Sequence, residues 1–420
     1  MMTAAMTAAP AHGPFDATVP LLRDPYRYIS RACAEAGADA VDTRIGFERA
    51  LLVTGVEAAR FFYAPSLFRR AEAMPSPLRK TLFGEGGVQG LDGPEHIRRK
   101  ALYMQIIGPD RVAPLAERAG QTLRARLERG DAERLAGQDI FAHALAEAVA
   151  DWAGVPLDDG DAEWLAETFG TLYEGSAEVG RGHLRARRAR TRADDWAERL
   201  VRRVRSGEVT PPEGSALAVL ADWRDRSGAL LPSKVAAVEL GSLMRPFTAV
   251  SVFLTFAGHA LATHRGLAER LREAPELIPS FVNEVRRTYP FFPLIAARTA
   301  KATEWRGHAL PEGRLVLLEI QGTNRDPTVW DAPDSFRPER FDGPQPGPFD
   351  MIPQGGGVHA TGHRCAGEWA TRAVMERATA ELLLHLNWAA LPDQDLSLDM
   401  QSLPAMPRDR LRLPAGLYPA

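Results

Sequence analysis

The sequence has little cysteine, little net charge and no long apolar run. Only two of its 420 residues are cysteines, Cys33 and Cys365, so a disulfide framework is excluded and a reducing, cytoplasmic setting is expected. The formal net charge of −3 provides no overall attraction to nucleic acid or to anionic membranes. No run of about 18 uninterrupted apolar residues occurs, so no transmembrane span is predicted.

The composition is that of a globular protein, with 45% hydrophobic and 25% charged residues. A chain of 420 residues can form two lobes or one large domain. The first 20 residues are rich in alanine and lack the basic and apolar regions of a signal peptide. We therefore expect a flexible leader over residues 1–20.

Helical periodicity dominates the middle of the chain, which predicts a mainly α protein. Ser233 is the predicted N-cap of a long helix whose central positions are mostly apolar, so this helix should be buried on nearly all sides. Short strand patterns come late. The ranges expected are helices at about 234–263, 279–289 and 367–385, and strands at 294–299, 303–305 and 315–321.

Cys365 lies in a glycine-rich loop that leads into the last helix, in the run Gly362-His363-Arg364-Cys365-Ala366-Gly367. Backbone N–H groups and the positive end of that helix would lower the pKa of the thiol and favour a thiolate. The competing interpretation is a small buried core cysteine. The loop alone leaves both open.

Two further motifs precede this loop. Glu284 and Arg287 are three residues apart on one helical face, which by itself describes many surface ion pairs. The segment Phe336-Arg337-Pro338-Glu339-Arg340-Phe341 follows, and an arginine of this segment, with Arg337 the candidate, could close a network with that pair.

These three motifs, in this order and spacing, resemble the signature of the cytochrome P450 superfamily. The resemblance implies a mainly α fold, a helical triangular prism with small β-sheets, in one domain over residues 21–420. Haem b would lie between the long central helix and the cysteine loop, with Cys365 as the iron ligand. Val358 is a departure, because the family usually has phenylalanine seven residues before the cysteine.

The middle of the long helix contains Arg245-Pro246, where ordinary members of this family have an acidic residue followed by threonine. A buried, unpaired guanidinium costs several kcal/mol, and proline removes a helical hydrogen bond. This combination predicts an anionic ligand, held by a charge-assisted pair of roughly 1.5–3 kcal/mol. The alternative is an arginine that reaches a haem propionate or an internal glutamate.

Arg245-Pro246 resembles the motif of the bacterial fatty-acid peroxygenases, and segments such as Gly87-Val88-Gln89-Gly90 and Tyr289-Pro290-Phe291-Phe292-Pro293 extend the likeness. The resemblance implies hydroxylation of fatty acids at the α carbon, with β as the second position. Hydrogen peroxide would be the co-substrate, and no redox partner would be required. The substrate carboxylate, held by Arg245, would act as the acid–base group. Ala366 departs from the proline that usually follows the cysteine.

The same resemblance implies roles for other residues, each of which could instead be an ordinary surface or core residue. Gln89 stands where the alkene-forming members have histidine, so hydroxylation is favoured over decarboxylation. Residues expected to line the substrate pocket are Phe83, Phe247, Val250, Phe291 and Phe292. Residues expected to bind the haem propionates are His96, Lys100, Arg298 and His363.

Two rival functions stay open at this point. One is a conventional P450 monooxygenase that depends on redox partners and acts on another acidic substrate. The other is a haem-thiolate protein that binds or senses a carboxylate. The basic stretch from Arg181 to Arg205 is interpreted as a solvated helix face that could steer anionic substrates.

Overall fold

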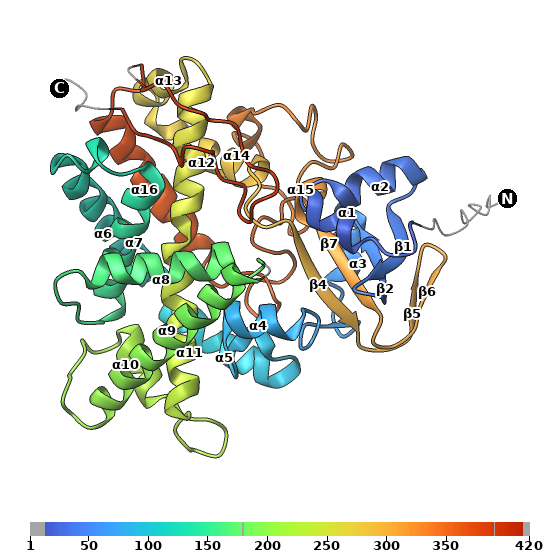
Figure 1. Ribbon diagram of the computed structural model, residues 1–420, viewed down its shortest axis with the longest axis horizontal. Helices are drawn as coiled ribbons and strands as arrows, with labels where there is room; N and C mark the ends of the chain where they lie inside the picture. The colour runs from blue at the N-terminus through green and yellow to red at the C-terminus, as the bar shows by residue number, and fades with distance from the viewer. Residues whose placement is uncertain (1–12, 179, 390, 415–420) are drawn as a thin grey trace.

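The computed structural model describes residues 13–178, 180–389 and 391–414. Helices form one side of the molecule and a sheet lies at the other (Figure 1). The first half contains α1 (Thr18–Arg23), α2 (Tyr28–Ala36), α3 (Val56–Phe62), α4 (Ser76–Phe83), α5 (Gly93–Ile106), α6 (Pro109–Glu128), α7 (Gly137–Ala153), α8 (Asp161–Gly175) and α9 (Arg181–Arg205). The second half contains α10 (Ala216–Asp222), α11 (Ser233–Thr248), α12 (Val250–Thr263), α13 (Leu267–Glu273), α14 (Ile278–Thr288), α15 (Ile320–Thr323) and α16 (Glu368–His385).

The main sheet joins the N-terminal part of the chain to residues 294–319, with the strand order β1-β2-β7-β4-β3. Its strands are β1 (Ala40–Ile45), β2 (Glu48–Val53), β3 (Phe68–Arg69), β4 (Leu294–Thr299) and β7 (Leu315–Glu319). Strand β2 pairs with β7 in parallel, and Leu51 lies opposite Val316. A second ribbon pairs β5 (Thr303–Trp305) with β6 (His308–Leu310). The mainly α prediction and the three late strands are confirmed, while β6 was not anticipated.

The predicted long helix is present, but it is interrupted at Ala249 between α11 and α12. Pro246 lies inside α11, where it cannot donate a backbone hydrogen bond, and the interruption follows within a turn. The N-cap prediction for Ser233 is wrong. Ser233 is the first helical residue, and its hydroxyl donates to a carboxylate oxygen of Glu198 at 2.6 Å because the helix start packs beside α9.

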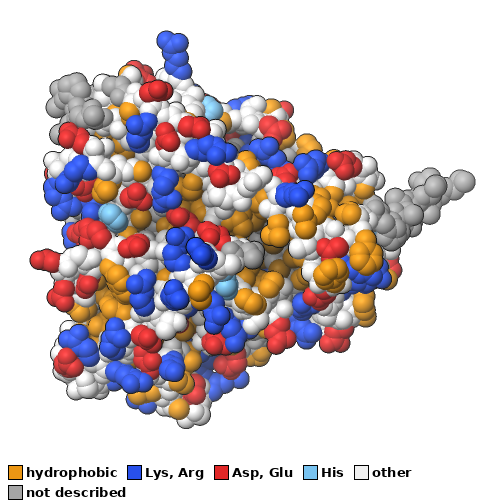
Figure 2. Space-filling view, viewed as in Figure 1, with side chains coloured by type: hydrophobic (Ala, Val, Ile, Leu, Met, Phe, Trp, Pro, Cys, Tyr) orange, Lys and Arg blue, Asp and Glu red, His pale blue; other side chains and the backbone are white. Residues whose placement is uncertain are grey.

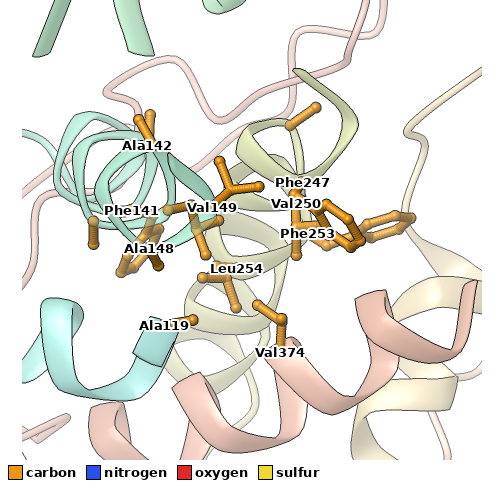
Figure 3. Packing of buried hydrophobic residues seen from close by; sticks show 14 of the residues in the cluster. Ala119, Phe141, Ala142, Ala148, Val149, Phe247, Val250, Phe253, Leu254 and Val374 are labelled. Carbon is orange, nitrogen blue, oxygen red and sulfur yellow. The ribbon is translucent and has the colours of Figure 1, made fainter. Parts of the chain in front are cut away.

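The stretch Ser233–Thr263 is also long and apolar enough to cross a membrane, but 89% of its most apolar window is buried inside the protein. Its apolar side chains meet neighbouring helices. Phe253 and Leu254 of α12 pack with residues of α6, α7 and α16, as Figure 3 shows for Ala119, Val149 and Val374. The helix is therefore the core around which the others assemble.

Residues 13–20, which the sequence analysis places in the leader, pack onto the first hairpin. The N–H of Gly13 donates to the carbonyl of Asp42, and the N–H of Ala17 donates to the carbonyl of Arg44. Ala17 is fully buried. Residues 1–12, where the rest of the expected leader falls, lie outside the described residues.

Candidate active site

The cysteine loop is fixed to the rest of the protein through its backbone. The N–H of Cys365 donates to the carbonyl of Gln354 at 2.9 Å, which closes the loop just before α16 begins. Gly355 adopts φ +95°, and a Cβ at this position would lie 3.1 Å from the hydroxyl oxygen of Tyr63. Glycine is therefore required here both for the backbone conformation and for the space.

The sulfur of Cys365 lies in a buried, polar setting. The side-chain amide of Gln354 approaches it to 3.8 Å. Burial raises the pKa of the Cys365 thiol, while the backbone N–H of Gly367 and the charge of Lys100 offset this effect only in part. The backbone N–H of Gly367 lowers this pKa, in the direction that the sequence predicts, but desolvation is the larger effect.

A buried ion network supports the loop from behind. The carboxylate of Glu368 accepts from Arg286 at 2.6 Å and from Arg364 at 2.5 Å. Arg286 also donates to the side-chain oxygen of Gln354 at 3.1 Å. These contacts fix the amide that faces Cys365. The sequence analysis assigned no role to Glu368, although it directly follows the quoted cysteine segment.

Three of the four predicted propionate-binding residues meet beside this loop. The ammonium of Lys100 contacts the carbonyls of Gly362 and Arg364, and burial lowers its pKa to about 8. The rings of His96 and His363 stack at 3.9 Å. His363 also lies 3.3 Å from a carboxylate oxygen of Asp92.

Arg70, which the sequence analysis missed, belongs to the same group of residues. Its backbone N–H donates to Asp92, and its charge lowers the pKa of both His96 and His363. Burial is the main cause of the low pKa of His96, about 4. The cluster therefore contains more basic groups than acidic ones, with Asp92 as its single carboxylate. Two acidic groups of a bound ligand would balance this surplus.

Arg298 lies elsewhere. Its guanidinium binds the carboxylate of Glu48 and the backbone carbonyls of Glu72 and Gly313. It makes no hydrogen bond or ion pair with His96, Lys100 or His363 within the described residues, because its strand β4 directs it toward β3 and the first hairpin. Its predicted role in propionate binding stays a prediction.

Arg245 lies buried in α11 with no partner of opposite charge among the described residues. It is only 4% exposed, and its Nε atom makes no hydrogen bond. Its guanidinium carbon lies 5.7 Å from the ring centre of Phe83. Burial and the like charge of Arg190 lower the pKa of Arg245 to about 10. The alternative that Arg245 reaches an internal glutamate is not seen in this structure.

A buried polar network lies one to two turns before Arg245. The carboxylate of Glu239 pairs with Arg99 and accepts from the hydroxyl of Tyr103. Glu239 is fully buried, and its burial raises its pKa. Glu239 lies six residues before Arg245 in the sequence, and the sequence analysis did not anticipate this network.

The network reaches the loop that contains Gln89. The N–H of Val88 lies 3.4 Å from the carboxylate of Glu239, and the hydroxyl of Ser242 lies 3.5 Å from the side-chain oxygen of Gln89. Gln89 sits in a short helical turn over Val88–Gly90, directly before α5. Gln89 is therefore linked to α11 one turn before Arg245.

The residues predicted to line the pocket lie in different surroundings. Phe83 faces Arg245, whereas Phe247 packs edge-on against Trp152 at 5.6 Å. Phe291 stacks on Phe253 of α12 at 4.6 Å. Phe292 meets the ring of Phe291 edge-on and is 39% exposed. Val250, the first residue of α12, is buried.

The pair of Glu284 and Arg287 is fully buried and bidentate, with distances of 2.7 and 2.8 Å. A second arginine, Arg340, also binds this carboxylate: its Nε donates to Glu284 at 3.2 Å. Arg337 contributes its backbone N–H, at 2.7 Å, while its side chain pairs with Asp331 at the surface. The expectation that the Arg337 side chain closes the network is wrong, because the turn at Pro338 directs the Arg340 side chain inward instead.

Comparison with known proteins identifies this architecture. The cytochrome P450 family profile matches residues 258–413. The solved structure of cytochrome P450SP alpha (CYP152B1) with (R)-ibuprofen is 41% identical, with a TM-score of 0.92, and the match covers 97% of this chain and 99% of that one. This chain belongs to the cytochrome P450 family.

Two other solved P450 structures are similar over nearly their whole length. Cytochrome P450EX alpha (CYP152N1) with myristic acid is 37% identical, and a variant of cytochrome P450 OleT with arachidonic acid is 30% identical. Each match covers 98% of this chain and 99% of the other, with a TM-score of 0.92. The protein is thus related to the CYP152 fatty-acid peroxygenases. Among curated relatives, the match to cytochrome P450 71D18 of Mentha gracilis is 34% identical but spans only 28% of that protein.

Membership in this family implies a haem bound through a cysteine thiolate. The residues present fit this group. Cys365 is a half-buried, free thiol, the kind of ligand that binds haem iron as a thiolate. Lys100, His96, His363 and Arg70 form a basic surplus beside it. These residues would hold the iron and the two propionates.

Proposed function

We propose that the protein is a hydrogen-peroxide-dependent fatty-acid hydroxylase that acts at the α carbon, with β as the second position. The observation that carries this proposal is the buried guanidinium of Arg245, which lies beside Phe83 and has no acidic partner among the described residues. The relatives solved with myristic and arachidonic acids support a long-chain carboxylate as its ligand.

Arg245 would hold the carboxylate of the fatty acid through a charge-assisted pair, bidentate where the fork of the guanidinium allows it. Pro246 lacks an N–H, so the carbonyl of Ser242, four residues earlier, loses its helical donor, and α11 is interrupted nearby. This leaves space beside Arg245. Because the carboxylate would be fixed, the carbons nearest to the reacting centre are the α and β carbons.

The carboxylate that Arg245 holds would also do the acid–base work. It accepts a proton from one oxygen of hydrogen peroxide and returns that proton to the other oxygen, which leaves as water. One hydrogen on carbon is replaced by hydroxyl, so a fatty acid and one peroxide give a hydroxy acid and one water. The bound haem would supply the oxidising chemistry.

Gln89 would favour hydroxylation over decarboxylation. Its amide is neutral and does not readily supply a proton, unlike a histidine at the same position. The hydrogen bond from Ser242 and the attachment of the loop to Glu239 keep Gln89 close to α11. Phe292 would keep the acyl chain shallow and so favour the α carbon.

The test is product analysis by gas chromatography after the haem-loaded protein receives a mid-chain fatty acid and hydrogen peroxide. We expect 2-hydroxy acid as the main product, and we expect its formation to collapse in the Arg245→Ala variant. A monooxygenase on another acidic substrate would instead need reduced nicotinamide and redox partners. A carboxylate sensor would give ligand-induced spectral shifts but no product.

A further inference from the structure

Helix α9 has a charge opposite to that of the rest of the protein. Its 25 residues include ten arginines and three acidic residues, a net charge of +7, whereas the remainder of the chain has 41 basic and 51 acidic residues, a net charge of −10. Basic side chains gather in Figure 2 over the region where Figure 1 places α9. The near-neutral total of the chain therefore conceals a strongly basic surface.

Half of these arginines form a straight stripe. At about 100° per residue, five arginines fall within about 60° of one helical face, over about 27 Å of the helix length. They are Arg181, Arg185, Arg188, Arg192 and Arg199. All five are exposed, and none has an acidic partner among the described residues. The opposite face is buried against α8 and α11 through Ala186, Ala189, Ala193 and Ala197. The helix thus has its apolar side covered and its basic side free.

The centre of the stripe is concave. Arg185, Arg188, Thr191 and Arg192 line a shallow hollow, which brings three guanidinium groups and a hydroxyl around one space. Guanidinium forks and hydroxyl groups are the donors that bind phosphate oxygens. Leu184, beside the stripe, is 46% exposed. This arrangement matches a phosphate with apolar material next to it.

A groove lies along another side of the same helix, about 120° around the helix axis from the stripe. It is lined by Thr81 and Gly84 at one side and by Arg190 and Asp194 of α9 at the other. Arg190 is 6% exposed, and its charge lowers the pKa of Arg245. Arg190 therefore lies between the groove and Arg245.

We propose that the arginine stripe of α9 binds the surface of an anionic lipid bilayer, with lipid phosphates in the hollow at Arg185, Arg188 and Arg192. The choice of a bilayer over another polyanion rests on the proposed function, because a long-chain fatty acid partitions into bilayers. A straight row of exposed charges with an exposed leucine beside it also suits a lipid surface. Docked in this way, the protein would lie next to the bilayer into which its substrate partitions.

The experiment is sedimentation of the haem-loaded protein with vesicles of phosphatidylcholine alone or with about one third phosphatidylglycerol. We expect binding only to the anionic vesicles, and we expect that binding to weaken steeply as salt rises, since exposed charges are screened. An arginine near an anionic surface contributes about a fivefold gain in binding. Replacing Arg185, Arg188 and Arg192 by glutamine should therefore weaken binding on the order of 100-fold.

Two matched variants make the test specific. Replacing the same three arginines by lysine keeps the charge and should retain most of the binding. Replacing Arg129, Arg265 and Lys301 by glutamine removes three exposed, unpaired charges elsewhere and should leave binding unchanged. The three glutamine replacements on α9 should also leave the turnover of a soluble short-chain acid unchanged.

Several outcomes would overturn the proposal. These are equal binding to neutral vesicles, an equal loss in the control variant, or a short DNA duplex that binds more tightly than the vesicles and with the same dependence on the three arginines. Vesicle sedimentation needs no turnover. A failure of lipid binding is therefore distinguishable from a failure of the proposed hydroxylase activity.

Discussion

Replacing Arg245 by methionine should stabilise the ligand-free protein while it destroys carboxylate binding. The guanidinium is 4% exposed and has no acidic partner among the described residues, and its pKa falls from 12.5 to about 10. A fall of that size corresponds to about 3 kcal/mol of unfavourable burial. Methionine fills a similar volume without charge. We therefore expect the free energy of unfolding to rise by about 1–3 kcal/mol.

The same variant should lose its response to fatty acid. A charge-assisted pair contributes roughly 1.5–3 kcal/mol, so the affinity for myristic acid should fall about 10- to 150-fold. Saturating ligand at about 100 times its Kd stabilises the wild type by about 2.7 kcal/mol, and the variant should gain much less at that concentration. The two effects have opposite signs, which separates them from a general loss of folding.

The assay is denaturant unfolding of both haem-loaded proteins, with and without myristic acid. Arg190→Met is the matched control, because Arg190 is equally buried but is paired with Asp194 at 2.8 Å, so its removal should lower stability. The reasoning is refuted if ligand-free Arg245→Met is less stable than the wild type. It is also refuted if myristic acid stabilises Arg245→Met as much as the wild type.

Three further predictions follow from other parts of the structure. Replacing Gln89 by histidine should raise the share of terminal alkene among the products, measured by gas chromatography; an unchanged alkene share would contradict the role given to the neutral amide. Burial raises the pKa of Glu319 to about 7 from 4.5, so its contribution to stability is fully present below pH 4.5 and is lost as pH rises to 7. The free energy of unfolding of the wild type should therefore fall by about 3 kcal/mol over that window, relative to that of Glu319→Gln. Parallel pH profiles of the two proteins would exclude this effect. Replacing Arg340 by alanine should cost about 3 kcal/mol, because it removes a buried partner of Glu284, whereas Arg337→Ala should change stability by less than about 0.5 kcal/mol; equal costs in thermal unfolding would argue against the assignment.

Local sequence patterns predicted the elements of this protein well. The bounds of β4 and β5 agree with the sequence prediction, and α14 and α16 begin within one residue of the predicted starts. These segments are bounded by proline, glycine or a change in apolar periodicity, and such signals act over a few residues. The N-cap at Ser233 failed because a distant residue, Glu198, provides a competing partner for its hydroxyl.

The sequence by itself determined which chemical groups the protein has: the cysteine loop, the pair of Glu284 and Arg287, and an arginine in the long helix where ordinary P450s have an acid. The tertiary structure alone decided their partners. It brought Arg70 to the two histidines, attached the Gln89 loop to Glu239, and left Arg245 without a counterion among the described residues. Which side chains meet depends on how helices and strands far apart in the chain pack together, and that geometry is not encoded in the spacing of neighbouring residues.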